Sequence, residues 1–398
     1  MVLPPTNKEI ERFSDSLDVN LDATMKPDFD SEPLTGKPAQ AGESIVIAVD
    51  ARPLQHPNSG IGKYTQKIVE YLAARPNVEL KLYGSTPLYT GNVPALSKAI
   101  EVLFSWFFFG LRARRDGAHL YWGPRHQLPW FLGNIPGVLT VHDVVWKVLP
   151  KTMPRFNYLV EWLQMPFSVR RASIVVAPSQ GTATEVKQHF RFSSEKIRVV
   201  FLGGDIPSDH STSGEDTHEA NRPLLFVGGD HPRKNLPMVL KALANTRNRE
   251  LKLSVLGALQ NPAATQALIE RLNLTERVTL LGELIEEEVA HRYSSCLALV
   301  MPSLHEGFGL PVLEAARFGR PALVAAGNPM ATMARGCVVV EQGNTEQLAV
   351  AMDNLVSDKQ LRLQLGDEAR AWAQPLTWAR CSEEHLALFL RLCMIRLG

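Results

Sequence analysis

The stretch from Cys296 to Ala322, CLALVMPSLHEGFGLPVLEAARFGRPA, contains an apolar run, a glycine-rich turn and an amphipathic segment. The apolar run, residues 297–301, ends at a proline and predicts a short buried strand. The glycines of the turn allow the backbone to approach a ligand closely, and Pro311 suits the first turn of a helix. We therefore expect a strand, a turn and a helix, which is the repeating unit of α/β sheets.

Two carboxylates, Glu306 and Glu314, lie eight residues apart in this stretch. Glu306 is expected at the carboxyl end of the strand and Glu314 about one turn into the helix, at the edge where open α/β sheets bind ligands. The first backbone N–H groups of the helix would suit a phosphate, and they belong to Phe308, Gly309 and Leu310. The spacing alone fits an ordinary connection with two surface glutamates equally well, so the hypothesis of a site depends on the rest of the chain.

The same alternation of apolar strands and helical segments runs from Ile45 to Phe201 and again from Pro223 to Val340. It predicts parallel sheets with helices on both faces, and 398 residues suffice for two domains. The fold class is therefore expected to be α/β, with two Rossmann-like parallel-sheet domains that face each other across a cleft. The predicted division is a disordered tail (1–43), an N-terminal domain (44–205), a polar linker (206–221), a C-terminal domain (222–374) and a final amphipathic helix (375–398).

The composition argues against several classes of function. A net charge of +1 gives no support for nucleic-acid binding. The four cysteines are scattered without a CxxC pair, which favours reduced thiols over disulfides or a zinc site. The N-terminus lacks the apolar segment of a secretory signal, and the longest aromatic run, residues 102–109, is too short to span a bilayer. We expect a cytoplasmic protein.

A second glycine turn, VGGDHPRKN at residues 227–235, follows the first predicted strand of the second half. Gly228 and Gly229 make the turn, and Arg233, Lys234 and Asn235 precede a helix. A glycine turn, two cations and a helix N-terminus together are typical of a phosphate site. The alternative is a loop with two surface cations.

The first half contributes two further candidates. In SGIGKY, residues 59–64, Gly60 and Gly62 open a helix, and the pair His142-Asp143 follows the strand predicted at 137–141. The third glycine of the dinucleotide fingerprint is missing, which disfavours a nicotinamide-dependent dehydrogenase. The two glycines either mark a turn or let the backbone reach a pyrophosphate, and the His-Asp pair is either structural or catalytic.

These groups together favour a nucleotide diphosphate that carries a sugar. Cations and helix N-termini suit the diphosphate, and carboxylates accept hydrogen bonds from sugar hydroxyls. Arg233 and Lys234 would stabilise the leaving diphosphate by neutralising the charge that develops on it. Because the sequence shows no cluster of metal ligands, we expect no essential metal.

Three segments carry a family resemblance: HDVVW at 142–146, VGGDHPRKN at 227–235 and HEGFGLPVLEAARFGRPAL at 305–323. Over roughly residues 45–395 the chain resembles the retaining glycosyltransferases of family 4, which have the GT-B fold. The resemblance implies that Glu306 holds the hydroxyls of the donor sugar and Glu314 those of the ribose, while Arg233 and Lys234 bind the diphosphate. It further implies that His142 lies by the transferred sugar, that the Gly60–Gly62 loop lies near the phosphates and that the last helix packs back on the first domain.

The chain departs from the family pattern in the segment Gly327-Asn328-Pro329-Met330, where many members carry a Pro-Glu pair. The segment WGPRHQLP before HDVVW is similar to bacterial mannosyltransferases of surface-polysaccharide assembly. The resemblance therefore implies a retaining hexosyltransferase that uses a nucleotide sugar, first of all GDP-mannose, and a glycan or lipid-linked acceptor, without another cofactor. The alternatives are UDP-glucose, GDP-fucose or dTDP-rhamnose as donor, a nucleotide-sugar epimerase of the same fold, and a non-catalytic sensor of sugar nucleotides.

The segment EVLFSWFFFGLRARRDG, residues 101–117, combines aromatic side chains with Arg112, Arg114 and Arg115. It predicts either a buried helix with a basic end or a surface helix that touches the inner face of the cell membrane. A second helix is predicted at 154–171, with Trp162, Met165 and Val169 on one side.

Overall fold

The computed structural model describes residues 44–84, 94–206 and 222–397. The predicted tail at 1–43 and nearly all of the predicted linker lie outside the described residues, so the division of the chain at these segments stays a prediction.

Residues 44–206 form a parallel six-stranded sheet in the order β2-β1-β3-β4-β5-β6. Its strands are β1 (Ile45–Asp50), β2 (Val78–Tyr83), β3 (Leu120–Gly123), β4 (Gly137–Thr140), β5 (Ile174–Ala177) and β6 (Ile197–Val199). The α-helices are α2 (Gly60–Ala73), α3 (Pro94–Arg115), α4 (Val145–Val148), α5 (Arg155–Arg171) and α6 (Gln180–Phe190). Short 3₁₀ turns lie at Arg52–Gln55 (η2), Pro150–Thr152 (η3) and Ser194–Lys196 (η4).

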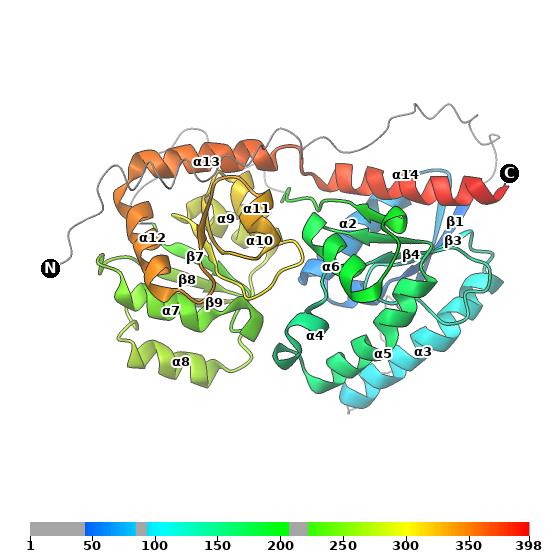
Figure 1. The fold of residues 1–398 in the computed structure, drawn as a ribbon, viewed down its shortest axis with the longest axis horizontal. Coiled ribbons are helices and arrows are strands. Elements are labelled where there is room, and N and C mark those ends of the chain that lie inside the picture. Colours follow the sequence, from blue (N-terminus) through cyan, green and yellow to red (C-terminus); the bar gives the residue numbers. More distant parts are fainter. Residues whose placement is uncertain (1–43, 85–93, 207–221, 398) are drawn as a thin grey trace. The chain divides into compact units, whose positions relative to one another are not determined.

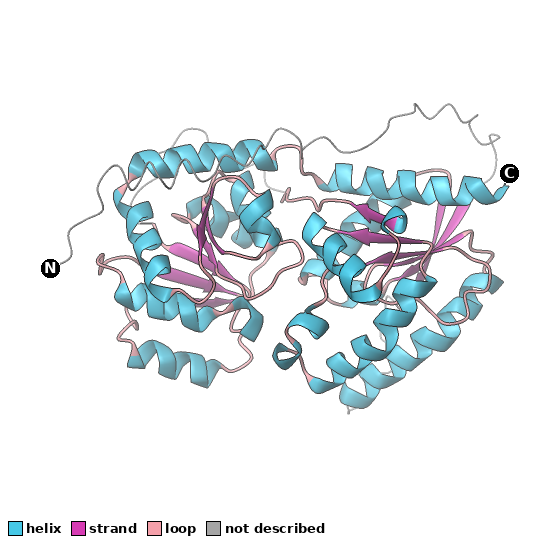
Figure 2. Ribbon diagram, viewed as in Figure 1, coloured by secondary structure: helices cyan, strands magenta, loops and turns pink. Residues whose placement is uncertain are grey.

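Residues 222–397 contain a second parallel sheet of six strands, in the order β12-β11-β10-β7-β8-β9. Its strands are β7 (Leu224–Val227), β8 (Leu253–Leu256), β9 (Val278–Gly282), β10 (Leu299–Met301), β11 (Ala322–Ala325) and β12 (Cys337–Val340). The helices are η5 (Pro232–Lys234), α7 (Leu236–Asn245), α8 (Pro262–Arg271), α9 (Glu286–Ser295), α10 (Leu310–Arg317), α11 (Pro329–Met333), α12 (Thr345–Ser357), α13 (Lys359–Ala373) and α14 (Trp378–Leu397). In both halves helices surround the strands (Figure 2), as apolar parallel sheets require.

The strand order creates a switch point in each sheet. In the second sheet the chain runs from β7 to β8 and β9 on one side, then returns to build β10 on the other side, where Leu299 pairs with Leu225. The loops after β7 and β10 therefore leave the same edge of the sheet in opposite directions. Ligands of open α/β sheets bind in such crevices.

The last helix, α14, returns to the first half and packs on α2 and β3 (Figure 1). Nδ1 of His385 faces the carbonyl oxygen of Cys381 at 2.7 Å, so Nε2 is free to accept a hydrogen bond from the Tyr64 hydroxyl, also at 2.7 Å. Phe389 packs against Trp122 of the first sheet. The prediction of two parallel-sheet domains, with a final helix that crosses back to the first, is confirmed.

The predicted apolar face of helix 154–171 is partly wrong. Met165 and Val169 are buried, but Trp162 is 52% exposed. Among the described helices none combines the length and the hydropathy that a membrane span needs.

Candidate active site

The turn after β7 can be made only by glycine. Gly228 and Gly229 have φ angles of +125° and +58°, and a Cβ at Gly229 would lie 2.0 Å from the carbonyl oxygen of Ala258. The turn brings η5, with Arg233 and Lys234, to the carboxyl edge of the sheet at the switch point.

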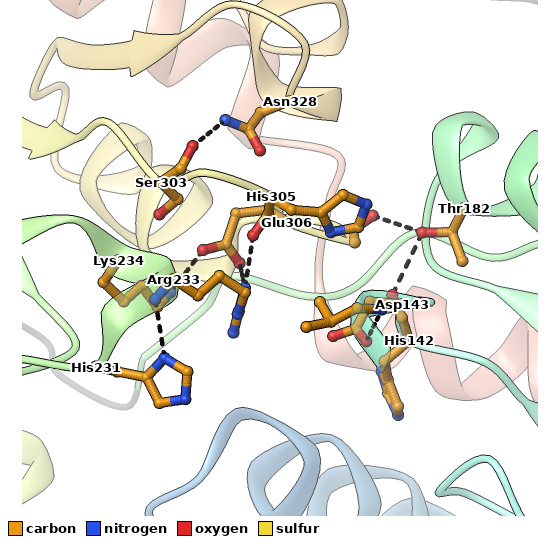
Figure 3. Close-up of polar contacts among 12 residues, drawn as sticks. His142, Asp143, Thr182, His231, Arg233, Lys234, Ser303, His305, Glu306 and Asn328 are labelled. Atoms are coloured by element: carbon orange, nitrogen blue, oxygen red, sulfur yellow. Dashed lines mark hydrogen bonds and ion pairs between the residues drawn. The ribbon is translucent and has the colours of Figure 1, made fainter. Parts of the chain in front are cut away.

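Glu306, in the loop after β10, is buried between these two cations (Figure 3). Its Oε2 lies 2.7 Å from Nη1 of Arg233, and its Oε1 lies 2.9 Å from Nζ of Lys234. Burial by itself raises the pKa of Glu306, but the charges of Lys234 and Arg233 outweigh burial and lower it to about 2. The carboxylate is therefore ionised and weakly basic, which suits a hydrogen-bond acceptor better than a general base.

Gly307 is the point at which the second half touches the loop after β4 of the first half. A Cβ at this position would lie 1.6 Å from the carbonyl oxygen of His142. The carbonyl oxygen of Gly307 accepts hydrogen bonds from the hydroxyls of Ser179 and Thr182, at 2.5 and 2.9 Å. Only a residue without a side chain fits this contact.

Helix α10 begins next to this contact. Gly309 has a φ of +101° and directly precedes the helix, and Phe308 is buried. Of the three residues predicted to offer N–H groups to a phosphate, Leu310 is the first residue of the helix, Gly309 is its N-cap and Phe308 precedes it.

Glu314 forms a second cluster on α10. Its Oε1 lies 2.9 Å from Nζ of Lys63, and its Oε2 accepts a hydrogen bond from the Tyr293 hydroxyl at 2.7 Å. Lys63 also lies 3.2 Å from Glu286. Burial lowers the pKa of Lys63, but Glu314 and Glu286 raise it by more, so this ammonium group stays charged.

His142 is buried, and its ring is neutral. Its Nε2 lies 2.8 Å from the carbonyl oxygen of Pro124 and must donate to it, so Nδ1 is left as an acceptor. Burial, helped by the charge of His126, lowers the pKa of His142 to about 3. The neighbouring Asp143 accepts a hydrogen bond from the backbone N–H of Val145 at 3.2 Å. A neutral imidazole with a free acceptor atom can receive a hydroxyl proton in a hydrogen bond but cannot act as a general acid at neutral pH.

The predicted residues therefore form separate groups. Arg233, Lys234 and Glu306 are in direct contact, Gly307 touches the backbone of His142, and Glu314 belongs to a different cluster. Gly60 and Gly62 open α2 after the N-cap Ser59, and the helix position after them is Lys63. No contact joins Glu306 to Glu314 among the described residues.

Sequence reasoning missed the residues that reach these groups from distant segments: Lys63, Ser179, Thr182 and Tyr293. The nearest signal was SGIGKY, where the lysine directly follows the second glycine. Nothing in the sequence indicated that its partner would be a carboxylate 251 positions away.

The comparison with known families agrees with this geometry. Residues 58–206 match the sequence model of Glycosyltransferase Family 4, and residues 213–372 match that of Glycosyl transferases group 1. The chain is a family 4 glycosyltransferase. A curated relative, O-antigen chain mannosyltransferase B of Escherichia coli, is 24% identical over 85% of this chain and 97% of its own length.

Solved structures show that this glycosyltransferase has the GT-B fold. The sucrose-phosphate synthase from Thermosynechococcus elongatus superposes with a TM-score of 0.72 at 18% identity, over 88% of this chain and 99% of that one. The Anabaena protein HepE, solved with UDP and glucose, has a TM-score of 0.66 at 19% identity, over 88% and 100% of the two chains.

Proposed function

We propose that this glycosyltransferase moves a hexose, in the first place mannose from GDP-mannose, to a glycan or lipid-linked acceptor with retention of anomeric configuration. The reaction would serve surface-polysaccharide synthesis, such as that of lipopolysaccharide, at the inner face of the cell membrane. The observation that carries the proposal is the buried Glu306, whose two oxygens are held by Arg233 and Lys234 at the switch point of the second sheet.

The cations and the carboxylate have complementary tasks. Arg233 and Lys234 together carry one charge more than Glu306 neutralises, so a diphosphate is attracted to this edge. Glu306, fixed by both cations, accepts hydrogen bonds from hydroxyls of the sugar. Glu314, about one turn into α10, is the group for the ribose, and the N-terminus of α10 adds N–H donors for phosphate.

The bond changes follow from this placement. The bond between C1 of the sugar and the diphosphate oxygen breaks, and the electron pair leaves with the diphosphate, where Arg233 and Lys234 stabilise it. The acceptor hydroxyl forms the new bond to C1, and its proton passes to the oxygen of the departing diphosphate. His142, neutral and with Nδ1 free, accepts a hydrogen bond from a sugar hydroxyl. These steps need no metal ion or cofactor besides the donor.

Mannose is the first choice because one of the relatives that match 85% of this chain is named as a mannosyltransferase. Guanine is the first choice of base because of the resemblance to bacterial mannosyltransferases of surface-polysaccharide assembly. HepE was solved with UDP, which keeps uridine donors, UDP-glucose above all, as the alternative to test. GDP-fucose and dTDP-rhamnose are further alternatives. A nucleotide-sugar epimerase of the same fold would convert the donor without any acceptor.

Thermal unfolding with GDP, UDP, ADP and dTDP tests the base, since a nucleotide that binds only the native state raises its melting temperature. Transfer from labelled nucleotide sugars to lipid-linked acceptors then tests the sugar, and the anomeric configuration of the product tests retention. We expect GDP to stabilise most and the double variant Glu306→Ala, Lys234→Ala to lose transfer. The exposed pair Glu287→Ala, Lys241→Ala is the control. Full activity of the first double variant, or product formation without acceptor, would contradict the proposal.

A further inference from the structure

Helix α3 presents an apolar stripe to solvent. Leu103 and Phe108 are each 51% exposed, and Leu111 follows one turn later. The opposite face, with Trp106 and Phe109, is buried in the first half. The helix is thus neither fully buried nor fully on the surface. One face belongs to the core, and the other is an exposed apolar surface with arginines at its end.

Helix α5 has a similar stripe. Leu159, Trp162 and Leu163 lie on consecutive turns and are about half exposed, and Phe156 extends the stripe to the first turn. The other face, with Met165 and Val169, is buried. Soluble proteins rarely place so many large apolar side chains together on one exposed helix face.

The loop residue Trp130 joins the two helices, which run next to each other in Figure 1. Its ring packs on Trp106 and Phe107 of α3 and on Phe167 of α5, and its Nε1 donates a hydrogen bond to Gln164 of α5. Trp130 and its neighbour Phe131 are themselves exposed. The two stripes and this loop therefore form one apolar surface, which we call the α3–α5 surface.

The charge around the α3–α5 surface is mostly positive. Arginines and lysines occupy the ends of both helices and the segment before α5: Arg112, Arg114, Arg115, Lys147, Lys151, Arg155, Arg170 and Arg171. The described residues 99–116 and 144–171 contain fewer acidic than basic residues. Glu161 is buried, Asp116 accepts a hydrogen bond from Tyr83 and pairs with Arg112, and Glu101 also interacts with other groups. A chain with a net charge of +1 thus concentrates positive charge around this exposed apolar surface.

We infer that the α3–α5 surface docks on a bilayer of anionic lipids. Trp and Phe side chains enter the boundary between headgroups and acyl chains, and the surrounding arginines and lysines bind the lipid phosphates. A second copy of the chain is less suited as partner, because two such basic rims would repel each other. The inference rests on the membrane location in the proposed function and names the surface that makes the contact, but it does not depend on the donor.

The buried face of α5 connects this surface to the active site. Its Glu161 carboxylate lies 3.5 Å from Nδ1 of His126, and Nε2 of His126 accepts the backbone N–H of His142. Gln164 and Ser168 of the same helix hold the backbone of Leu128. A bilayer on the outer face of α5 therefore lies one helix thickness from the sugar-binding loop, where a lipid-linked acceptor would be presented.

Flotation of the full chain with vesicles tests the inference, using phosphatidylcholine alone or mixed with phosphatidylglycerol. We expect binding to the anionic vesicles, weakened by salt, and a loss of about a hundredfold when Arg114, Arg115 and Arg170 become Gln, at roughly tenfold per one to two charges. The variant Phe108→Ser, Leu159→Ser, Trp162→Ser should bind at least about tenfold more weakly. The control Ile285→Ser, Val350→Ser, Leu363→Ser removes exposed apolar side chains from the second half.

Two results would overturn the inference: anionic vesicles that do not bind the parent protein, or equal binding by the parent and both surface variants. A dimer in sedimentation that the Ser variant abolishes would assign the surface to a second copy instead. Transfer to a water-soluble acceptor is measured in parallel. It should be unaffected by the surface variants, so failure of the docking inference is distinguishable from failure of the proposed function.

Discussion

At the scale of single residues, the site is held by charges that compensate one another in a buried place. Glu306 is buried and faces Arg233 and Lys234, whose side chains are themselves largely covered. Removing one member of such a group leaves the others without a partner, which costs more than the pair contributes when complete. The same side chains are therefore expected to affect both stability and activity.

Replacing Glu306 by Gln tests this coupling. The variant keeps the shape but leaves two covered cations without their counter-charge, so we expect a loss of about 3 kcal/mol in the free energy of unfolding. Adding Lys234→Met should recover part of this loss, because it removes one of the unpaired charges. Urea denaturation measures both effects, with the exposed Glu287→Gln as control. Unchanged stability of Glu306→Gln would show that the three groups are not electrostatically coupled.

Lys63 is the clearest case of a site residue that only the structure reveals. It holds one oxygen of Glu314, the carboxylate proposed to bind ribose, from the other half of the molecule. Without its charge Glu314 loses its positioning, so Lys63→Met should raise KM for the donor about tenfold, as expected for one charged hydrogen bond, and leave kcat nearly unchanged. The control is Lys67→Met, one turn along α2, where the lysine lies 3.9 Å from Glu70. A donor KM equal to that of the parent would refute this role.

At the scale of secondary structure, strands and turns were the part that the sequence predicted well. Continuous apolar runs such as 297–301 and glycine turns such as 228–229 indicate buried parallel strands and their connections by local rules. The helices α12 and α13 were not anticipated, and Trp162 was placed on the wrong side of its helix. A helix that buries one face and offers the other to a partner has no clear amphipathic pattern, because both faces are apolar.

Gly307 makes a contact with a distant segment that local sequence patterns could not predict. The sequence predicted a ligand-facing glycine, but the structure places the backbone of His142 where a side chain would be. Gly307→Ala must therefore push the two backbones apart, and we expect a loss of about 1–3 kcal/mol in unfolding free energy together with loss of transfer. Calorimetry checks the first and the transferase assay the second. Gly60→Ala is the control for stability, because a Cβ at that position meets no atom within 4 Å; a melting temperature of Gly307→Ala as high as that of the control would contradict the expectation.

At the scale of the whole molecule, side chains from distant segments connect the two halves. The contacts are Lys63 with Glu314, the carbonyl of Gly307 with two hydroxyls, the return of α14, and His305 with Glu185 of α6. Pairings of this kind depend on which surfaces meet after both sheets have formed. They could not be predicted from one sequence, although the return of the last helix could be expected from the family resemblance.

The His305–Glu185 contact makes this connection sensitive to pH. Nε2 of His305 lies 2.7 Å from Oε1 of Glu185, and burial lowers the pKa of His305 while Glu185 and Asp143 raise it by more, against the opposing charge of Arg233. The folded state therefore holds this proton more tightly than the unfolded chain, whose histidine has its ordinary pKa of 6.5. The stabilisation is complete below that pH and is lost as the pH rises through the higher pKa of the folded state.

We therefore expect the difference in unfolding free energy between the parent and Glu185→Gln to be largest in mildly acidic solution and to shrink as the pH rises above 6.5. Melting temperatures of both proteins across this range measure it. Glu195→Gln, an exposed carboxylate of the same half, should show no such trend. A difference that stays constant or grows with pH would mean that His305 is neutral in the folded protein. The contact would then join the halves only as an ordinary hydrogen bond, and the placement of Glu306, the next residue in the chain, would not respond to pH.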